Sequence, residues 1–331
     1  MGRIDDFGVV PGVEITVLVD NSADLIVEST ETVKRFTKKP LLAEHGLAAL
    51  IDFEEAGVCI LWDAGISQMA LLENAERMEI DLTAVDKIAL SHGHRDHYAA
   101  MTPVIRRVVG KPEPREWAKD ASVDEIRSWV ERHRVPLIAH PAAFRERWGI
   151  GKDGKKHGPH NVPREEWEAA GAEIVLSDGP YRLAPGCWTT GAIPRKSFER
   201  SGIPSSLAYR EGNEFIRDFL EDDQAVVIHV QDKGLVVLTG CAHSGVINTV
   251  RYAREISGVD RVFAVLGGFH LARAKDDEIE RTIDELVRMT PEMVVSAHCT
   301  GFKAMARFAE RMPDRFVQGV VGTRYLLRRR E

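Results

Sequence analysis

The sequence has no long hydrophobic run, few cysteines and no hydrophobic segment at its N-terminus. Its apolar stretches, such as residues 47–51, are far shorter than the ~20 residues that a membrane-spanning helix needs. The N-terminus is polar and acidic, and it does not resemble a secretory signal. Four cysteines among 331 residues cannot form a disulfide framework and favour a reducing compartment. We therefore expect a cytoplasmic protein that contacts no membrane.

The sequence also has fewer positively charged than negatively charged residues. The 44 Lys and Arg residues against 51 Asp and Glu residues leave a net charge of −7, which disfavours binding to nucleic acid. The motifs Gly-x-Gly-x-x-Gly, Gly-x-x-x-x-Gly-Lys-Ser/Thr and Gly-x-Ser-x-Gly are all absent. These absences disfavour dinucleotide-binding enzymes, P-loop enzymes and serine hydrolases.

Strands and helices alternate in the first and last thirds of the sequence. Hydrophobic periodicity predicts strands over residues 13–19, 47–53, 58–62 and 86–90, and helices over 66–78 and 96–109. It predicts further strands over 225–230, 234–239, 261–266 and 293–296, and helices over 246–256, 277–288 and 302–311. The predicted fold class is α/β, with two facing sheets and helices outside both, as a four-layer αβ/βα sandwich.

Residues 111–223 carry a weaker signal. We expect a charged helix over 123–133, a short strand over 136–139 and an irregular glycine-rich loop over 149–163. A loop of this length is typical of a lid or a binding loop. Because regular strands resume at residue 225, we interpret this span as an insertion into a single domain that covers residues 1–331.

The strongest chemical signal is the segment Ser-His-Gly-His-Arg-Asp-His at residues 91–97. His92 and His94 lie two residues apart, so in an extended chain their side chains point the same way and can bind one ion. Asp96 and His97 follow where a helix begins, so the segment can offer two metal sites a few ångströms apart. These ligands predict one or two divalent metal ions, with zinc favoured and iron or manganese as alternatives.

This segment, after the strand Ile-Ala-Leu-Ser at 88–91, resembles the signature of the metallo-β-lactamase superfamily. The strand end Leu-Trp-Asp-Ala-Gly at 61–65 resembles that superfamily's first motif, which implies that Asp63 supports the metal loop. Four further strings begin at Ala43, Thr239, Leu266 and Ala297: Ala-Glu-His-Gly-Leu, Thr-Gly-Cys-Ala-His-Ser-Gly, Leu-Gly-Gly-Phe-His-Leu and Ala-His-Cys-Thr-Gly. They resemble the branch named 7,8-dihydropterin-6-yl-methyl-4-(β-D-ribofuranosyl)aminobenzene 5′-phosphate synthases. The resemblance implies the αβ/βα fold of the superfamily.

The resemblance also implies the remaining metal ligands. His298 matches the last ligand histidine of the superfamily and would complete the site that holds Asp96 and His97. Many relatives have a bridging carboxylate in a Gly-Asp pair, but here the pair reads Gly-Cys and ends at Cys241. Either Cys241 is a thiolate ligand or bridge, or it is a buried neighbour and His243 alone coordinates. We expect His243 to be a ligand.

Four further residues have alternative assignments. His270 follows two glycines at a strand end and could be a ligand, a phosphate contact or, as we favour, a proton donor. Glu44 and His45 precede a predicted strand and could overhang the site to bind substrate, or be structural. Cys299 follows His298, and strand alternation places it on the opposite face as a buried thiol.

The resemblance implies a metal-dependent enzyme that acts on a small molecule carrying phosphate. In the family's reaction, metals would activate loss of pyrophosphate from a hydroxymethyl-dihydropterin diphosphate, and a ribosyl-aminobenzene phosphate would be the acceptor. Asp96 would be both ligand and catalytic acceptor for a bridging water, and His270 the proton donor. The first alternative is a phosphoesterase or other hydrolase, and a diiron redox protein, a nuclease and a ligand sensor are weaker ones. The oligomeric state stays open.

Overall fold

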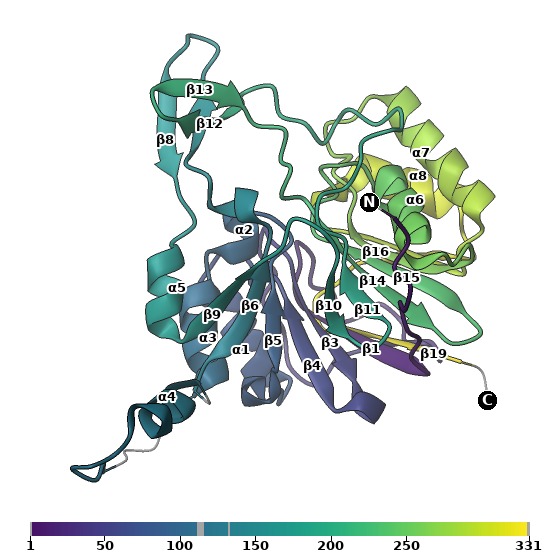
Figure 1. The fold of residues 1–331 in the computed structure, drawn as a ribbon. Helices are drawn as coiled ribbons and strands as arrows, with labels where there is room; N and C mark the ends of the chain where they lie inside the picture. The colour runs from purple at the N-terminus through teal and green to yellow at the C-terminus, as the bar shows by residue number, and fades with distance from the viewer. Residues whose placement is uncertain (1, 111–115, 132, 330–331) are drawn as a thin grey trace.

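The structure is a computed structural model that describes residues 2–110, 116–131 and 133–329 (Figure 1). Two large sheets face each other. The first has eight strands in the order β2-β19-β1-β3-β4-β5-β6-β9, and the second has seven in the order β10-β11-β14-β15-β16-β17-β18. The strands of the first sheet are β1 (Gly12–Val19), β2 (Val33–Arg35), β3 (Ala48–Phe53), β4 (Val58–Trp62), β5 (Lys87–Ala89), β6 (Val135–Ala139), β9 (Ala172–Leu176) and β19 (Thr323–Arg328). Those of the second are β10 (Tyr181–Ala184), β11 (Cys187–Thr189), β14 (Ala225–Val230), β15 (Gly234–Thr239), β16 (Val262–Gly268), β17 (Met293–Ala297) and β18 (Phe316–Gln318).

Helices cover the outer face of each sheet (Figure 1). The helices are α1 (Ala70–Arg77), α2 (Arg95–Tyr98), α3 (Met101–Val109), α4 (Val123–Glu131), α5 (Arg164–Ala170), α6 (Val246–Ser257), α7 (Asp276–Met289) and α8 (Phe302–Arg311). Apolar side chains of α1, α3 and α5 pack on the first sheet, and those of α6, α7 and α8 pack on the second. A third apolar layer, which includes Trp62 and Leu238, fills the space between the sheets. The predicted four-layer αβ/βα sandwich is confirmed.

Strand direction determines where the ends of the strands meet. Strands β4, β5, β6 and β9 run parallel, and so do β15, β16, β17 and β18. Their carboxyl ends therefore lie along one edge of each sheet, which is the edge where α/β proteins place their binding sites. The C-terminal strand β19 returns to the first sheet and pairs with β1.

Two predictions about local structure are wrong. The helix predicted over 96–109 is interrupted between α2 and α3, and Pro103 lies in the first turn of α3, where its missing N–H breaks no helical hydrogen bond. The loop predicted over 149–163 contains β8 (Lys156–His160), which pairs with β7 (Arg147–Ile150). With β12 (Leu207–Glu211) and β13 (Glu214–Arg217) they form a four-stranded sheet. Hydrogen bonds between the paired strands satisfy the backbone groups of this polar segment, which has no hydrophobic face.

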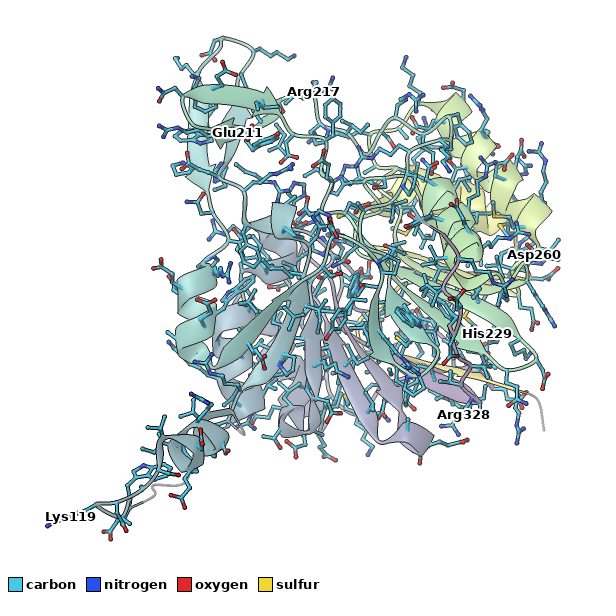
Figure 2. All side chains as sticks on the ribbon, in the orientation of Figure 1. Lys119, Glu211, Arg217, His229, Asp260 and Arg328 are labelled. Carbon is cyan, nitrogen blue, oxygen red and sulfur yellow. The ribbon has the colours of Figure 1, made fainter. Side chains whose placement is uncertain are left out.

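The four-stranded sheet stands away from the two large sheets, on the side of α2 (Figure 1). Figure 2 labels Glu211 and Arg217 on it. Helix α4 also extends away from the body of the molecule (Figure 1) and ends at Glu131, while residue 132 of the predicted 123–133 helix lies outside the described residues. None of the helices in the described part of the chain is long and apolar enough to cross a membrane.

Candidate metal centre

The histidines singled out in the sequence lie together at the carboxyl ends of the strands. His92 and His94 follow β5, His243 follows β15, His270 follows β16 and His298 follows β17. Candidate ligands form three overlapping groups, and within each group the ligand atoms all lie within 4.8 Å of one another. The groups are His92, His94 and His243; Asp96, His97, Cys241 and His298; and Cys241, His243 and His270. The two sheets therefore bring all eight of these residues to one place.

The first group has the protonation that a metal site requires. His243 donates from Nδ1 to the carbonyl oxygen of Gly202 at 2.7 Å, so its Nε2 carries no proton. This Nε2 lies 3.1 Å from Nδ1 of His94, close to the about 3.3 Å that separates two nitrogens on one tetrahedral zinc. The Nε2 atom of His92 is buried and has no hydrogen-bond partner among the described residues. Three ring nitrogens thus converge on one point.

Burial keeps the three rings of this group neutral. It lowers the pKa of His94 to about 4, with a further contribution from the charge of Arg147. It also lowers the pKa of His92 and of His243 well below the usual value, with help from the neighbouring imidazoles. Neutral imidazole is the form that binds metal, so no proton has to be displaced from these rings near neutral pH.

The second group is supported by Asp63. This residue follows β4 with a positive φ of 60°, and its Oδ2 accepts from Nδ1 of His97 at 2.7 Å. The same carboxylate accepts from the backbone N–H and the hydroxyl of Ser91, both at 2.7 Å. His97 therefore presents Nε2 to the cluster, 3.2 Å from Sγ of Cys241. Burial opposes a proton on His97, but the carboxylates of Asp63 and Asp96 raise its pKa to about 9.

Asp96 lies between His298 of the second group and the nearby His45. Its Oδ2 is 3.3 Å from Nε2 of His298 and 3.2 Å from Nε2 of His45. Burial opposes ionisation of Asp96, but the charge of His97 and contacts with the neighbouring imidazoles lower its pKa far below the usual value, so it is a carboxylate. Nε2 of His298 is buried and has no hydrogen-bond partner in the described part of the chain.

Cys241 and Cys299 both lie near the cluster, although Cys299 was expected to face away from it. Cys241 follows β15, and its Sγ belongs to two of the three groups. Cys299 does not face away, and that prediction is wrong. Its Sγ contacts the carbonyl oxygen of Cys241 at 3.6 Å, because the chain leaves strand geometry at His298, where φ is 47°, and forms a short 3-10 turn.

His270, Glu44 and His45 lie around this cluster. The ring of His270 is 4.2 Å from that of His243, and its contact with the Cys299 thiol outweighs burial and raises its pKa. Oε1 of Glu44 accepts from the backbone N–H groups of Ile66 and of the next residue, both at 3.0 Å, so Glu44 braces the turn after Asp63. His45 is exposed and contacts Asp96.

Sequence reasoning missed a buried ion-pair network beneath the metal loop. Arg147 of β7 donates from Nε to Asp218 at 2.7 Å and also pairs with Asp222. Asp222 in turn accepts from the backbone N–H of Gly93 at 2.7 Å, between the two histidines of the loop. No local pattern signals these contacts, because the partners lie about 70 residues or more apart in the chain.

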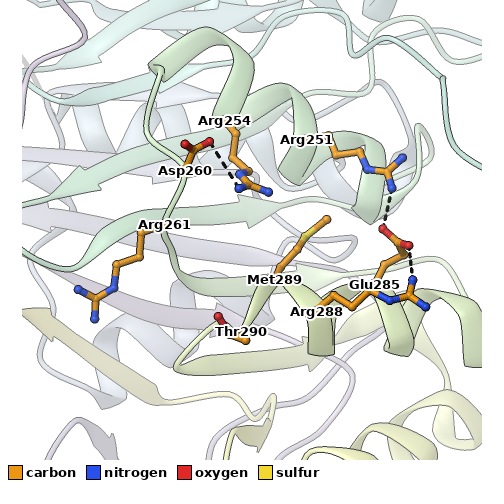
Figure 3. A pocket seen from close by; sticks show the side chains of 8 residues that line it. All are labelled: Arg251, Arg254, Asp260, Arg261, Glu285, Arg288, Met289 and Thr290. Carbon is orange, nitrogen blue, oxygen red and sulfur yellow. Dashed lines mark hydrogen bonds and ion pairs between the residues drawn. The ribbon is translucent and has the colours of Figure 1, made fainter.

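A separate hollow of about 580 Å³ lies between α6 and α7 (Figure 3). It contains none of the candidate ligands. Its lining includes Arg251, Arg254 and Arg288, which pair with Asp260 and Glu285. Arg254 lies in the last turn of α6, whereas His243 precedes the first turn of that helix, so the hollow is at the other end of α6 from the metal centre.

The relatives of the chain agree with this fold. The chain is 31% identical over 284 residues to the 7,8-dihydropterin-6-methyl-4-(β-D-ribofuranosyl)-aminobenzene-5′-phosphate synthase of Methanocaldococcus jannaschii, across 84% of this chain and 88% of that protein. The chain belongs to this synthase family. It is also 29% identical over 308 residues to an uncharacterized protein of the same organism, across 93% of this chain and 98% of that protein. No protein-family model matches the chain.

Solved structures show that the chain has the metallo-β-lactamase fold. A metal-dependent hydrolase of the β-lactamase superfamily superposes with a TM-score of 0.69 and 22% identity, across 94% of this chain and 98% of that one. A metallo-β-lactamase fold protein from Bacillus subtilis superposes with a TM-score of 0.51 and 11% identity, across 96% and 99%. The resemblance inferred from the strand-end motifs is confirmed at the level of family and fold.

Proposed function

We propose that this protein is a metal-dependent enzyme that transfers a group between small molecules, at least one of which carries phosphate. The observation that carries the proposal is the convergence of histidine ring nitrogens on the Asp96 carboxylate and the Cys241 thiol. In His97 and His243 the other ring nitrogen is bonded to an acceptor, which is the arrangement that orients histidine toward a metal.

The donor set fits two divalent ions. His92, His94 and His243 would hold one ion. Asp96, His97 and His298 would hold the other, with Cys241 as a ligand or bridge between the two groups. Imidazole, carboxylate and thiolate together suit zinc, although iron or manganese also accept nitrogen and oxygen ligands. A bound ion supplies Lewis acidity, which polarises a phosphate oxygen or lowers the pKa of water.

The residues of the chain would contribute positioning and proton transfer. Asp96 accepts a hydrogen bond from the attacking group, and His270 donates a proton to the leaving phosphate oxygen. The chain's similarity to the M. jannaschii synthase supports a dihydropterin and a ribofuranosylaminobenzene phosphate as the two substrates. Asp63 fixes His97, while Glu44 and His45 complete the mouth of the site. The proposed reaction involves neither a nucleic acid nor a membrane.

Hydrolysis of a phosphate ester is the second candidate. The side chain of His45 is 61% exposed and that of Asp96 is 18% exposed, so water reaches the cluster from one side. In the absence of an acceptor, water would then take its place. A diiron redox protein fits less well, because Cys241 stands where such proteins need a carboxylate bridge.

The test combines metal analysis with assays of both reactions. The purified protein is assayed for pyrophosphate release from a hydroxymethyl-dihydropterin diphosphate, with and without the aminobenzene acceptor, and its metal content is measured by mass spectrometry. We expect the double variant His92→Ala/His94→Ala to lose metal and activity together. His229→Ala is the control: His229 lies on β14 (Figure 2) and pairs with Leu235 at the start of β15, whereas His243 follows the other end of β15. Full metal content in the double variant would refute the site.

A further inference from the structure

Asn21 lies between His45 and His298 at the mouth of the cluster. Its side-chain amide makes four contacts. Oδ1 lies 3.2 Å from the backbone nitrogen of Gly46 and 3.0 Å from Nδ1 of His298. Nδ2 lies 3.2 Å from the carbonyl oxygen of His298 and 3.3 Å from Nδ1 of His45. One amide therefore joins two histidines that both contact Asp96.

Two of these contacts define the orientation of the amide. The backbone nitrogen of Gly46 can only donate, so the atom facing it must be the amide oxygen. The carbonyl oxygen of His298 can only accept, so the atom facing it must be the amide nitrogen. The oxygen therefore faces Nδ1 of His298, and the nitrogen faces Nδ1 of His45. The amide thus favours a different tautomer in each ring.

The tautomer of each ring follows from this orientation. Nδ1 of His298 faces an acceptor and carries a proton, so in the neutral ring Nε2 is a lone pair. Nδ1 of His45 faces a donor and carries no proton, so the neutral ring is protonated at Nε2. The two Nε2 atoms lie 3.3 and 3.2 Å from the same oxygen of Asp96. Distance alone does not distinguish these rings, but their tautomers do.

The contact between His298 and Asp96 fits a shared cation. With His298 neutral, the Nε2 lone pair and the carboxylate oxygen are 3.3 Å apart and repel each other, and a positive ion beside both would remove this repulsion. The contact between His45 and Asp96 needs no ion, because an N–H meets a carboxylate. Burial separates the two rings in the same way, since the side chain of His298 is fully buried and that of His45 is 61% exposed.

We propose that Asn21 is a positioning residue that sets opposite tautomers in the two histidines. Through Asn21, His298 presents Nε2 as a metal ligand, and His45 acts as a hydrogen-bond donor that holds the Asp96 carboxylate from the substrate side. Asp20 assists, because its Oδ1 accepts from the backbone N–H of His298 at 2.8 Å. The ligand half of this inference rests on the proposed function, whereas the tautomer of His45 does not.

The test uses two substitutions of Asn21 that separate its effect on His45 from its effect on His298. Asn21→Asp keeps an acceptor for Gly46 and for Nδ1 of His298 but removes the donor to His45. Asn21→Leu removes both. The readout is imidazole nitrogen NMR of the zinc-loaded full-length protein with isotope-labelled histidine, together with its zinc affinity. The signal of His45 is assigned by its loss in His45→Gln.

We expect His45 to be protonated at Nε2 in the wild type and at Nδ1 in Asn21→Asp, with zinc affinity within about threefold of wild type. In Asn21→Leu we expect zinc affinity to fall by about 10–100-fold, the usual effect of removing a partner of a ligand histidine. Circular dichroism checks that each variant is folded.

Two results would overturn the inference. One is a His45 that stays protonated at Nε2 in Asn21→Asp, and the other is an Asn21→Leu variant that binds zinc as tightly as the wild type. Neither readout involves turnover. A protein that shows the expected tautomers but no transfer reaction would contradict the proposed function alone.

Discussion

Oδ2 of Asp63 lies 2.7 Å from Nδ1 of His97, and both side chains are fully buried. Asp63 follows β4, and His97 lies in α2, so this contact ties the end of a strand to the helix that carries two candidate ligands. The carboxylate also accepts from the hydroxyl of Ser91, whose oxygen lies 2.9 Å from Nδ1 of His92. A single buried carboxylate thereby orients histidines of both metal groups.

Asp63→Asn should weaken metal binding without changing the shape of the site. The amide that replaces the carboxylate offers one acceptor where three donors now converge, so His97 loses its preferred tautomer. We expect metal affinity to fall by about 10–100-fold, measured by competition with a chelator. Asp86→Asn is the matched control, because Asp86 is exposed just before β5. Equal affinities for the two variants would contradict the orienting role of Asp63.

The candidate residues that the structure brings together lie where strand geometry determines their positions. His243 and His298 follow apolar strands whose parallel neighbours end at the same edge, so their approach to the 92–97 segment follows from topology. Cys299 was placed on the wrong face because the alternation of a strand was continued one residue too far. A positive φ at His298 ends the strand there, and nothing in the local composition signals that turn.

Contacts between distant segments could not be predicted in this way. Arg147 and Asp222 are 75 residues apart, and neither lies in a periodic pattern. Strand β8 escaped prediction because all of its residues are exposed, so it has no apolar alternation, and it contains glycine and proline. The contacts of Asn21 depend on three loops that meet only in the folded chain.

Stability should depend on pH through Glu292. Burial raises the pKa of this carboxyl, but contacts with Lys233 at 3.0 Å and Arg261 at 2.8 Å outweigh burial and lower it below 4.5. A carboxyl with a lowered folded-state pKa stabilises the fold above the unfolded-state pKa, and this stabilisation is lost as the pH falls through the folded-state value. Glu292→Gln should therefore cost about 0.5–1 kcal/mol at pH 7 and less near pH 4.

Urea unfolding at the two pH values measures this difference, and Glu55→Gln is the control because Glu55 is exposed. A cost for Glu292→Gln that is the same at both pH values would show that the contacts of Glu292 do not depend on its charge.

Arg147→Met should destabilise the protein strongly. The side chain of Arg147 is 2% exposed and those of Asp218 and Asp222 are fully buried, so removing the guanidinium leaves two buried carboxylates without a cation. The loss of one partner of a buried ion pair costs about 3–5 kcal/mol. The matched control is Arg145→Met, because Arg145 pairs with Glu221 near the surface, where such a pair contributes about 1 kcal/mol or less. Similar unfolding free energies for the two variants would contradict this account.

Cys241→Ala should separate the two interpretations of this cysteine. If the thiolate is a ligand, cobalt bound in place of zinc gives a sulfur-to-metal charge-transfer band, and the band disappears in this variant. We expect the band in the wild type and in Cys299→Ala, the matched control. Cys299 belongs to none of the three ligand groups, whereas Sγ of Cys241 belongs to two of them and lies 3.2 Å from Nε2 of His97. A band that persists in Cys241→Ala would leave His243 as the ligand from this loop and Cys241 as its buried neighbour.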